Sequence, residues 1–112
     1  MLVWPIAAPA KVAWGGRVSP GFKQKTIEIA DRLSMDPDIL MTIIAFETGG
    51  SFDPAKKNRA GSGATGLIQF MPKTAKGLGT TTRALAAMDA LDQLDYVEMY
   101  LRPYTGRMTD LP

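Results

Sequence analysis

Two residue types that are common in enzyme active sites are absent from this 112-residue chain, which contains neither cysteine nor histidine. Disulfide bonds, thiolate and imidazole metal sites, cysteine nucleophiles and histidine-dependent catalytic triads are therefore excluded. No known cofactor motif is present either, and we expect the protein to use no cofactor and no metal. Any catalysis has to come from carboxylates, lysine, tyrosine or hydroxyl groups.

The chain also lacks an evident export signal and a strongly one-sided charge. Residues 1–10 are apolar, but Pro5 and Pro9 interrupt them and no basic residue precedes them, so we expect no signal peptide. No apolar run is long enough to span a membrane. The net charge of +2 falls short of the dense basic surface of a nucleic-acid-binding protein, although it is compatible with an anionic polymer as partner.

The amino acids that are present are typical of a single soluble domain. Hydrophobic residues make up 46% of the chain and charged residues 21%, and a chain of this length can bury one modest core. We expect a monomer that folds without a partner. Prolines, glycines and two tryptophans in residues 1–19 predict an irregular N-terminal arm, and residues 20–112 form the domain itself.

Apolar spacing and capping residues predict an all-α fold with, at most, a small irregular hairpin. The predicted helices cover residues 20–34, 37–48, 72–78 and about 89–101. The second of these is apolar on nearly every side and is expected to be the buried central helix. In the last helix, a packed face of leucines and valine is expected to lie opposite a solvent face of Asp92, Asp95 and Glu98.

The glycine-rich stretch from residue 49 to 66 is expected to be a long loop or an irregular hairpin, and loops of that length tend to be functional. It contains Lys56, Lys57 and Arg59, which either attract an anionic substrate or form an ordinary solvated charge cluster. Asp53, directly before a proline, is interpreted as a turn residue rather than as a catalytic carboxylate.

Glu47 is the most informative residue of the sequence. It continues the apolar stripe of Leu40, Ile43 and Ile44 at helical spacing and stands at the helix end, where the dipole disfavours negative charge. If the side chain is buried, its pKa rises and it becomes a proton donor near neutral pH. A glutamate that points into water from a fraying helix end fits the pattern equally well.

A DNA-binding helix-turn-helix is the competing interpretation, because a tight turn at residues 35–37 joins the first two predicted helices. The second helix argues against it. It offers isoleucine, leucine, methionine, phenylalanine and a repulsive glutamate, whereas recognition helices present polar or basic side chains to base edges.

Two segments resemble the catalytic region of a known family. They are Phe46-Glu47-Thr48-Gly49-Gly50-Ser51-Phe52-Asp53-Pro54 and Gly63-Ala64-Thr65-Gly66-Leu67-Ile68-Gln69-Phe70-Met71-Pro72-Lys73-Thr74-Ala75. The sequence resembles soluble lytic transglycosylases and goose-type lysozymes of the lysozyme-like superfamily, especially their phage-associated members. A looser resemblance extends from about residue 18 to 104.

The resemblance implies a peptidoglycan-cleaving enzyme that cuts between N-acetylmuramic acid and N-acetylglucosamine, with Glu47 as general acid and then base. It also implies a set of substrate-binding residues, of which Gln69 is the best candidate for a hydrogen bond to sugar: Thr48, Ser62, Gly66, Leu67, Ile68, Gln69, Phe70 and Tyr96. The implied place of action is the bacterial cell wall, in the periplasm or outside the cell, as part of a phage virion or a host-lysis protein.

Three points keep alternatives open. Relatives have a serine that supports the catalytic glutamate, where this chain has Ala60 with Ser62 nearby. The family usually continues with helices that supply an active-site tyrosine, so we expect a fold that is truncated at its C-terminal end. The alternatives to a transglycosylase are a hydrolytic muramidase, which needs a second carboxylate, and a non-catalytic cell-wall-binding or structural component.

Overall fold

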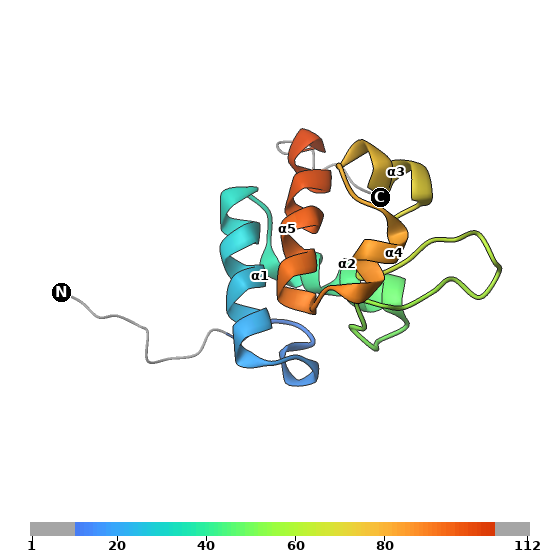
Figure 1. Ribbon diagram of the computed structural model, residues 1–112. Coiled ribbons are helices and arrows are strands. Elements are labelled where there is room, and N and C mark those ends of the chain that lie inside the picture. The colour runs from blue at the N-terminus through green and yellow to red at the C-terminus, as the bar shows by residue number, and fades with distance from the viewer. Residues whose placement is uncertain (1–10, 105–112) are drawn as a thin grey trace.

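The computed structural model describes residues 11–104, which form a helical domain without a named strand in that range (Figure 1). None of its helices combines the length and the apolar character that a membrane span requires. Its elements, in chain order, are the 3-10 helix η2 (Gly15–Arg17), α1 (Pro20–Arg32), α2 (Pro37–Thr48), α3 (Pro72–Gly77), α4 (Thr82–Ala87), α5 (Ala90–Leu101) and the 3-10 helix η3 (Arg102–Tyr104).

Capping side chains account for where four of these helices begin. Each cap oxygen accepts a hydrogen bond from a backbone N–H of the first turn, over 2.8–3.1 Å, and so satisfies a group that has no partner within the helix. The four caps are Ser19, Asp36, Thr81 and Asp89. The predicted helix starts before α1, α2 and α5 are thereby confirmed.

The core lies where α1 packs against both α2 and α5. In Figure 1, α1 and α5 stand side by side and α2 crosses behind them. Fully buried side chains from all three helices meet there, among them Ile29, Leu40, Ile44, Leu94 and Val97. The apolar stripes that predicted α1 and α5 are the surfaces that this packing removes from water.

Two expectations about the helices are wrong. The side chains of α2 are not enclosed on every side, because Ile39 and Phe46 are exposed. Their side of the helix has no packing partner among residues 11–104, so apolar composition alone overestimated its burial. The short helix α4 was not predicted at all, since six residues are too few to show a period.

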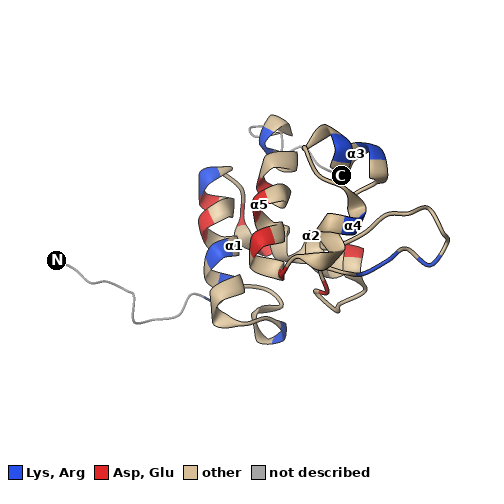
Figure 2. Cartoon of the chain, in the orientation of Figure 1, with Lys and Arg blue, Asp and Glu red and all other residues tan. Residues whose placement is uncertain are grey.

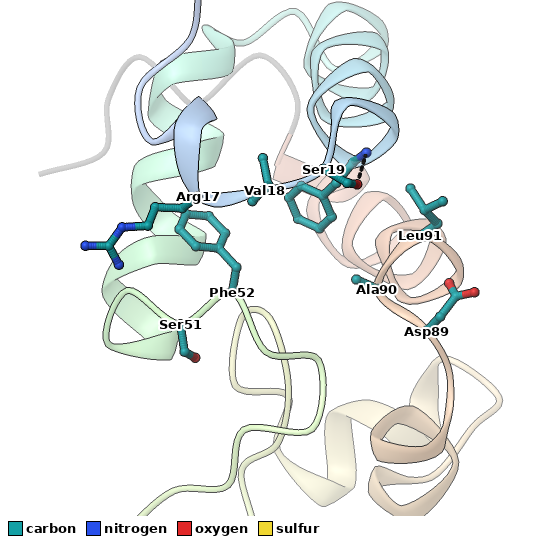
Figure 3. Close-up of a pocket in the computed structure, with 9 residues that line it drawn as sticks. Arg17, Val18, Ser19, Ser51, Phe52, Asp89, Ala90 and Leu91 are labelled. Atoms are coloured by element: carbon teal, nitrogen blue, oxygen red, sulfur yellow. Dashed lines mark hydrogen bonds between the residues drawn. The ribbon is translucent and has the colours of Figure 1, made fainter.

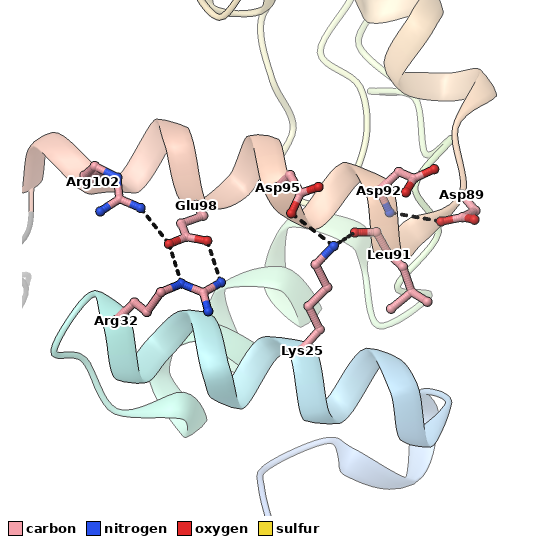
Figure 4. Close-up of polar contacts among 8 residues, drawn as sticks. All are labelled: Lys25, Arg32, Asp89, Leu91, Asp92, Asp95, Glu98 and Arg102. Carbon is pink, nitrogen blue, oxygen red and sulfur yellow. Dashed lines mark hydrogen bonds and ion pairs between the residues drawn. The ribbon is translucent and has the colours of Figure 1, made fainter.

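Glu98 contradicts the expected solvent face of α5, because it is only 7% exposed. Its two carboxylate oxygens accept hydrogen bonds from Arg32 on α1, at 2.9 and 2.8 Å, and Arg102 adds a contact of 2.7 Å (Figure 4). The hydrogen bond from Arg32 is the main cause that lowers the pKa of Glu98. Two arginines from neighbouring elements thus compensate the burial of this charge.

A second ion pair joins the same two helices nearer to the start of α5. The Lys25 ammonium lies 3.0 Å from Asp95 and donates to the backbone oxygen of Leu91 (Figure 4). When the whole chain is coloured by charge, basic positions on α1 and acidic positions on α5 therefore face one another (Figure 2). Opposite charges on adjoining helix faces reinforce the apolar contact between α1 and α5.

Residues 49–71 fold back on themselves without forming a regular strand. Isolated antiparallel bridges link Thr65 to Lys57 and to Phe70. The expected irregular hairpin is therefore present only as single bridges rather than as paired strands. Of the predicted N-terminal arm, residues 1–10 lie outside the described residues. Ala13, in the described part, donates its backbone N–H to Asp38 at 2.8 Å, which attaches this segment to the start of α2.

Candidate active site

Glu47 is the last residue but one of α2. The helix ends there because Gly49 adopts a left-handed conformation, with a φ of 63°, and turns its N–H back to carbonyl groups of the last turn. The side chain is half-buried rather than enclosed, since the helix end exposes its flanks. Among residues 11–104 no salt bridge engages the carboxylate.

Tyr100 of α5 is the aromatic neighbour of this carboxylate. Burial is the main cause that raises the pKa of the Tyr100 phenol, and the adjacent Tyr104 and the negative charge of Glu47 raise it further. The Tyr100 ring meets Phe70 edge to face, with the ring centroids 6.2 Å apart. The segment before α3 and the end of α5 therefore meet at Phe70 and Tyr100, and the charge of Glu47 at the end of α2 acts on the same tyrosine.

Thr48 follows Glu47 but faces the interior. Its side chain is fully buried, and its hydroxyl donates to the Ile44 carbonyl at 2.8 Å while it accepts from the Phe52 N–H at 2.9 Å. These two bonds attach the start of the long loop to the last turn of α2. The structure thus gives Thr48 a role in positioning the loop and leaves it no surface for a sugar.

The turn of residues 66–70 is partly buried in the protein interior. Gly66, Leu67 and Phe70 are buried, and Ile68 and Gln69 are half-buried. Backbone hydrogen bonds between Thr65 and Phe70, at 2.8 and 3.0 Å, close this turn. The part of the turn that a ligand can touch is therefore formed by Ile68 and Gln69.

Gln93 of α5 holds the turn of residues 66–70 in place, and the sequence did not predict it as a site residue. Its fully buried amide accepts from the Leu67 N–H at 2.7 Å and donates to the carbonyls of Pro54 and Leu85 at 2.8 and 2.9 Å. Every hydrogen bond goes to a backbone group of a different segment, so one side chain holds the loop, the turn and α4 together.

Gly66 is the residue that this anchor requires. A Cβ at position 66 would overlap Oε1 of Gln93, and the φ of 91° at this position is one that side chains rarely adopt. The glycine lets the buried amide approach the backbone of the turn. A signal for Gln93 did exist in the sequence, because it lies four residues before Val97 on the apolar stripe of α5.

Gln69 uses part of its side chain inside the loop. Its Nε2 donates to the carbonyls of Lys56 and Gly66, both at 3.0 Å, and its backbone is left-handed with a φ of 55°. This fixes the amide at the edge of the turn. Its Oε1 is the remaining polar atom of that side chain and can accept a hydrogen bond.

Three other candidates lie elsewhere or serve locally. Ser62 is exposed in the loop, where its hydroxyl accepts from the Ala64 N–H at 3.2 Å. Asp53 accepts from the Ala55 N–H at 2.8 Å, as a turn residue does. Tyr96 is half-buried and packs on the hydrophobic core, one helical turn before Tyr100. The tyrosine whose phenol interacts with the charge of Glu47 is instead Tyr100, and the sequence did not predict Tyr100 as a site residue.

One surface hollow lies at the start of the long loop and does not include Glu47. It has a volume of about 390 Å³ and is bordered by the starts of α1 and α5, with Phe22, Phe52 and Leu91 in its wall (Figure 3). Within residues 11–104, no group of three or more acidic residues is placed to hold a metal ion. The acid–base groups that the structure couples are the Glu47 carboxylate and the Tyr100 phenol.

Comparison with known families decides what this arrangement belongs to. The family model described as "Transglycosylase SLT domain" matches residues 24–98, well over half of the chain. The chain belongs to the transglycosylase SLT domain family. No solved structure gives a significant match to it.

Membership of the SLT family confirms the resemblance and the lysozyme-like, all-α fold. The protein is accordingly a glycosidase-type enzyme of the lytic transglycosylase kind, and its substrate is peptidoglycan. Action on the cell wall fits a place outside the cytoplasm. The matched range contains Glu47, the turn of residues 66–70 and Gln93, whereas Tyr100 lies two residues beyond it.

Proposed function

We propose that Glu47 is the general acid, and then the general base, of a lytic transglycosylase that cuts the bond between N-acetylmuramic acid and N-acetylglucosamine. The observation that supports this most is the position of the carboxylate. It stands half-buried at the end of α2, with no salt bridge to another described residue, and its charge acts on the phenol of the half-buried Tyr100.

The reaction needs only this one carboxylate. The Glu47 carboxyl group donates its proton to the glycosidic oxygen while the bond from that oxygen to the anomeric carbon breaks, and N-acetylglucosamine leaves with a new hydroxyl group. The 6-hydroxyl of the muramic residue then attacks the anomeric carbon and gives its proton to the Glu47 carboxylate. A 1,6-anhydro end forms, no water is consumed and the acid is restored.

The neighbours of Glu47 supply positioning. Tyr100 is the phenol whose pKa the charge of Glu47 raises, so the two groups are electrostatically coupled. The half-buried Gln69 and Ile68 form the edge of the turn, where the Gln69 oxygen can accept a hydrogen bond from a sugar hydroxyl or N-acetyl N–H. The basic residues Lys56, Lys57 and Arg59 attract the anionic cell wall over a longer range.

A hydrolytic muramidase is less well supported. Inverting hydrolysis needs a second carboxylate that activates water on the opposite face of the sugar. Asp53 is the acidic residue of the loop that follows α2, and its Oδ1 is engaged by the Ala55 N–H within its own turn. Action within a phage particle or during host lysis, and the monomeric state, stay predictions.

The test compares the wild-type protein with Glu47→Gln on purified peptidoglycan. We expect turnover to fall by about three orders of magnitude, because a positioned acid–base group contributes roughly 10²–10⁴-fold. Equal rates for the two proteins would refute the role of Glu47. Mass spectrometry of the released fragments then decides the reaction, since 1,6-anhydro ends support transglycosylation and reducing ends would show hydrolysis.

A further inference from the structure

A second hollow, of about 450 Å³, borders the last two turns of α2. Two aromatic side chains, Trp14 and Phe46, line it together with Arg17 and the glycines that end the helix; we call it the aromatic hollow. Phe46 is 82% exposed and Trp14 43%. Single exposed apolar side chains are common on protein surfaces, but two aromatic rings on one hollow indicate a binding surface.

Trp14 is held in place although much of its surface is open. Its backbone adopts a left-handed conformation, with a φ of 65°, which is uncommon for a residue with a side chain. Its ring lies 6.3 Å from the Phe52 ring and 5.9 Å from the Arg17 guanidinium carbon. A ring that is already ordered loses little entropy when a ligand packs against it.

Arg17 provides the only charge in the lining of the aromatic hollow. Its Nη1 donates to the Gly50 carbonyl at 3.0 Å, which holds the guanidinium at the end of α2. In Figure 3 the side chain extends away from Leu91 and Ala90, as this bond requires. The hollow therefore favours a ligand with an apolar face and a carboxylate.

We propose that the aromatic hollow binds a sugar of the peptidoglycan strand together with a carboxylate of its stem peptide. The C–H face of a pyranose ring packs against aromatic rings, and Arg17 complements the negative charge of the stem. Phe46 directly precedes Glu47 in α2, and Gly49 and Gly50, which end that helix, also line the hollow. This inference rests on the proposed function.

The test is a binding experiment with a protein that does not cut its ligand. Glu47→Gln removes the acid, and Trp4→Phe leaves Trp14 as the only tryptophan of the chain. We titrate this protein with chitotetraose and with an uncross-linked disaccharide-tetrapeptide repeat, and follow Trp14 fluorescence. Both ligands are expected to give a saturable change.

Two further substitutions in that background identify the groups that bind. Phe46→Ala is expected to weaken both ligands about tenfold, which corresponds to about 1.4 kcal/mol. Met99→Ala, which truncates another exposed apolar residue, on α5, serves as the control and leaves both affinities within twofold. Arg17→Met is expected to weaken the stem-bearing ligand about tenfold and chitotetraose by less than twofold.

Several results would overturn the inference. They are unchanged affinities in Phe46→Ala, equal losses in Met99→Ala, and equal losses of both ligands in Arg17→Met. A dimer in sedimentation that Phe46→Ala dissociates would instead assign the hollow to a second copy of the chain. Failure of the proposed function is a separate outcome, because it requires full turnover by Glu47→Gln, which this binding experiment does not measure.

Discussion

The last turns of α2 and α5 each contain a glutamate, and the two carboxylates have opposite environments. Glu98 is buried, accepts three hydrogen bonds from two arginines and has a lowered pKa. Glu47 is half-buried, and no salt bridge among the described residues engages it. From the sequence, Glu98 was expected to face water, whereas a buried and a water-exposed Glu47 fitted the pattern equally well.

The difference shows how one residue type serves two purposes in one small domain. The two arginines favour the ionised form of Glu98, and Arg32 joins α1 to α5 through it. This carboxylate is therefore poorly suited to donate a proton. Glu47 has no such cationic partner among the described residues. Burial alone therefore does not identify a catalytic carboxylate in this fold, because the more buried of these two glutamates is held by arginines.

Exchanging each carboxylate for its amide separates the two roles, and this gives the largest expected effect. Glu47→Gln should lose about three orders of magnitude in turnover and keep its melting temperature, whereas Glu98→Gln should keep its turnover per folded molecule and melt earlier. Fragment release and thermal unfolding measure the two quantities. The comparison fails if both variants lose the same property.

The next largest effect is expected from a substitution in the turn of residues 66–70, which leaves both carboxylates unchanged. Gly66→Ala should lower the free energy of unfolding by about 3 kcal/mol, because its Cβ meets the Gln93 amide and its φ is strained. Gly61→Ala is the matched control: its φ is 80°, but no atom lies within 4 Å of the added Cβ. We expect it to cost about 1 kcal/mol, and equal losses in urea unfolding would contradict the packing argument.

Removing one partner of Glu98 has a smaller effect. Arg32→Met deletes two charge-assisted hydrogen bonds to a buried carboxylate and should destabilise the fold by about 2 kcal/mol. Lys25→Met removes the more exposed ion pair with Asp95 and should cost about 0.5 kcal/mol. Denaturant titration of both variants checks this, and a larger loss for Lys25→Met would show that burial is not the deciding factor.

The smallest effect is the pH dependence that Glu98 contributes. Its pKa is lowered in the folded protein from an ordinary value of 4.5, so its stabilisation is fully present above that pH and is lost as the pH falls through the folded-state pKa. The stability difference between the wild type and Glu98→Gln should therefore shrink as the pH is lowered from about 5. A difference that stays constant down to pH 2 would contradict this.

Local signals were sufficient for much of the fold. Ser19, Asp36 and Asp89 mark the starts of α1, α2 and α5 because a cap acts on its own first turn. The motif around Glu47 and residues 66–70 indicated the family because it keeps a fixed spacing along the chain. Tyr100 and Gln93 were missed as site residues, since their roles depend on contacts with segments 26 or more residues away.

The sequence by itself determined the helices, the family and the identity of the candidate acid, because these depend on neighbours within a few turns or on a fixed motif. Only the tertiary structure decided that Glu98 is paired with arginines and that no salt bridge among the described residues engages Glu47. It also showed that Thr48 faces inward and that the rings of Trp14 and Phe46 share a hollow. The physical reason is that burial and ion pairing are set by whichever elements come to lie opposite, and helical periodicity specifies a face without naming its partner.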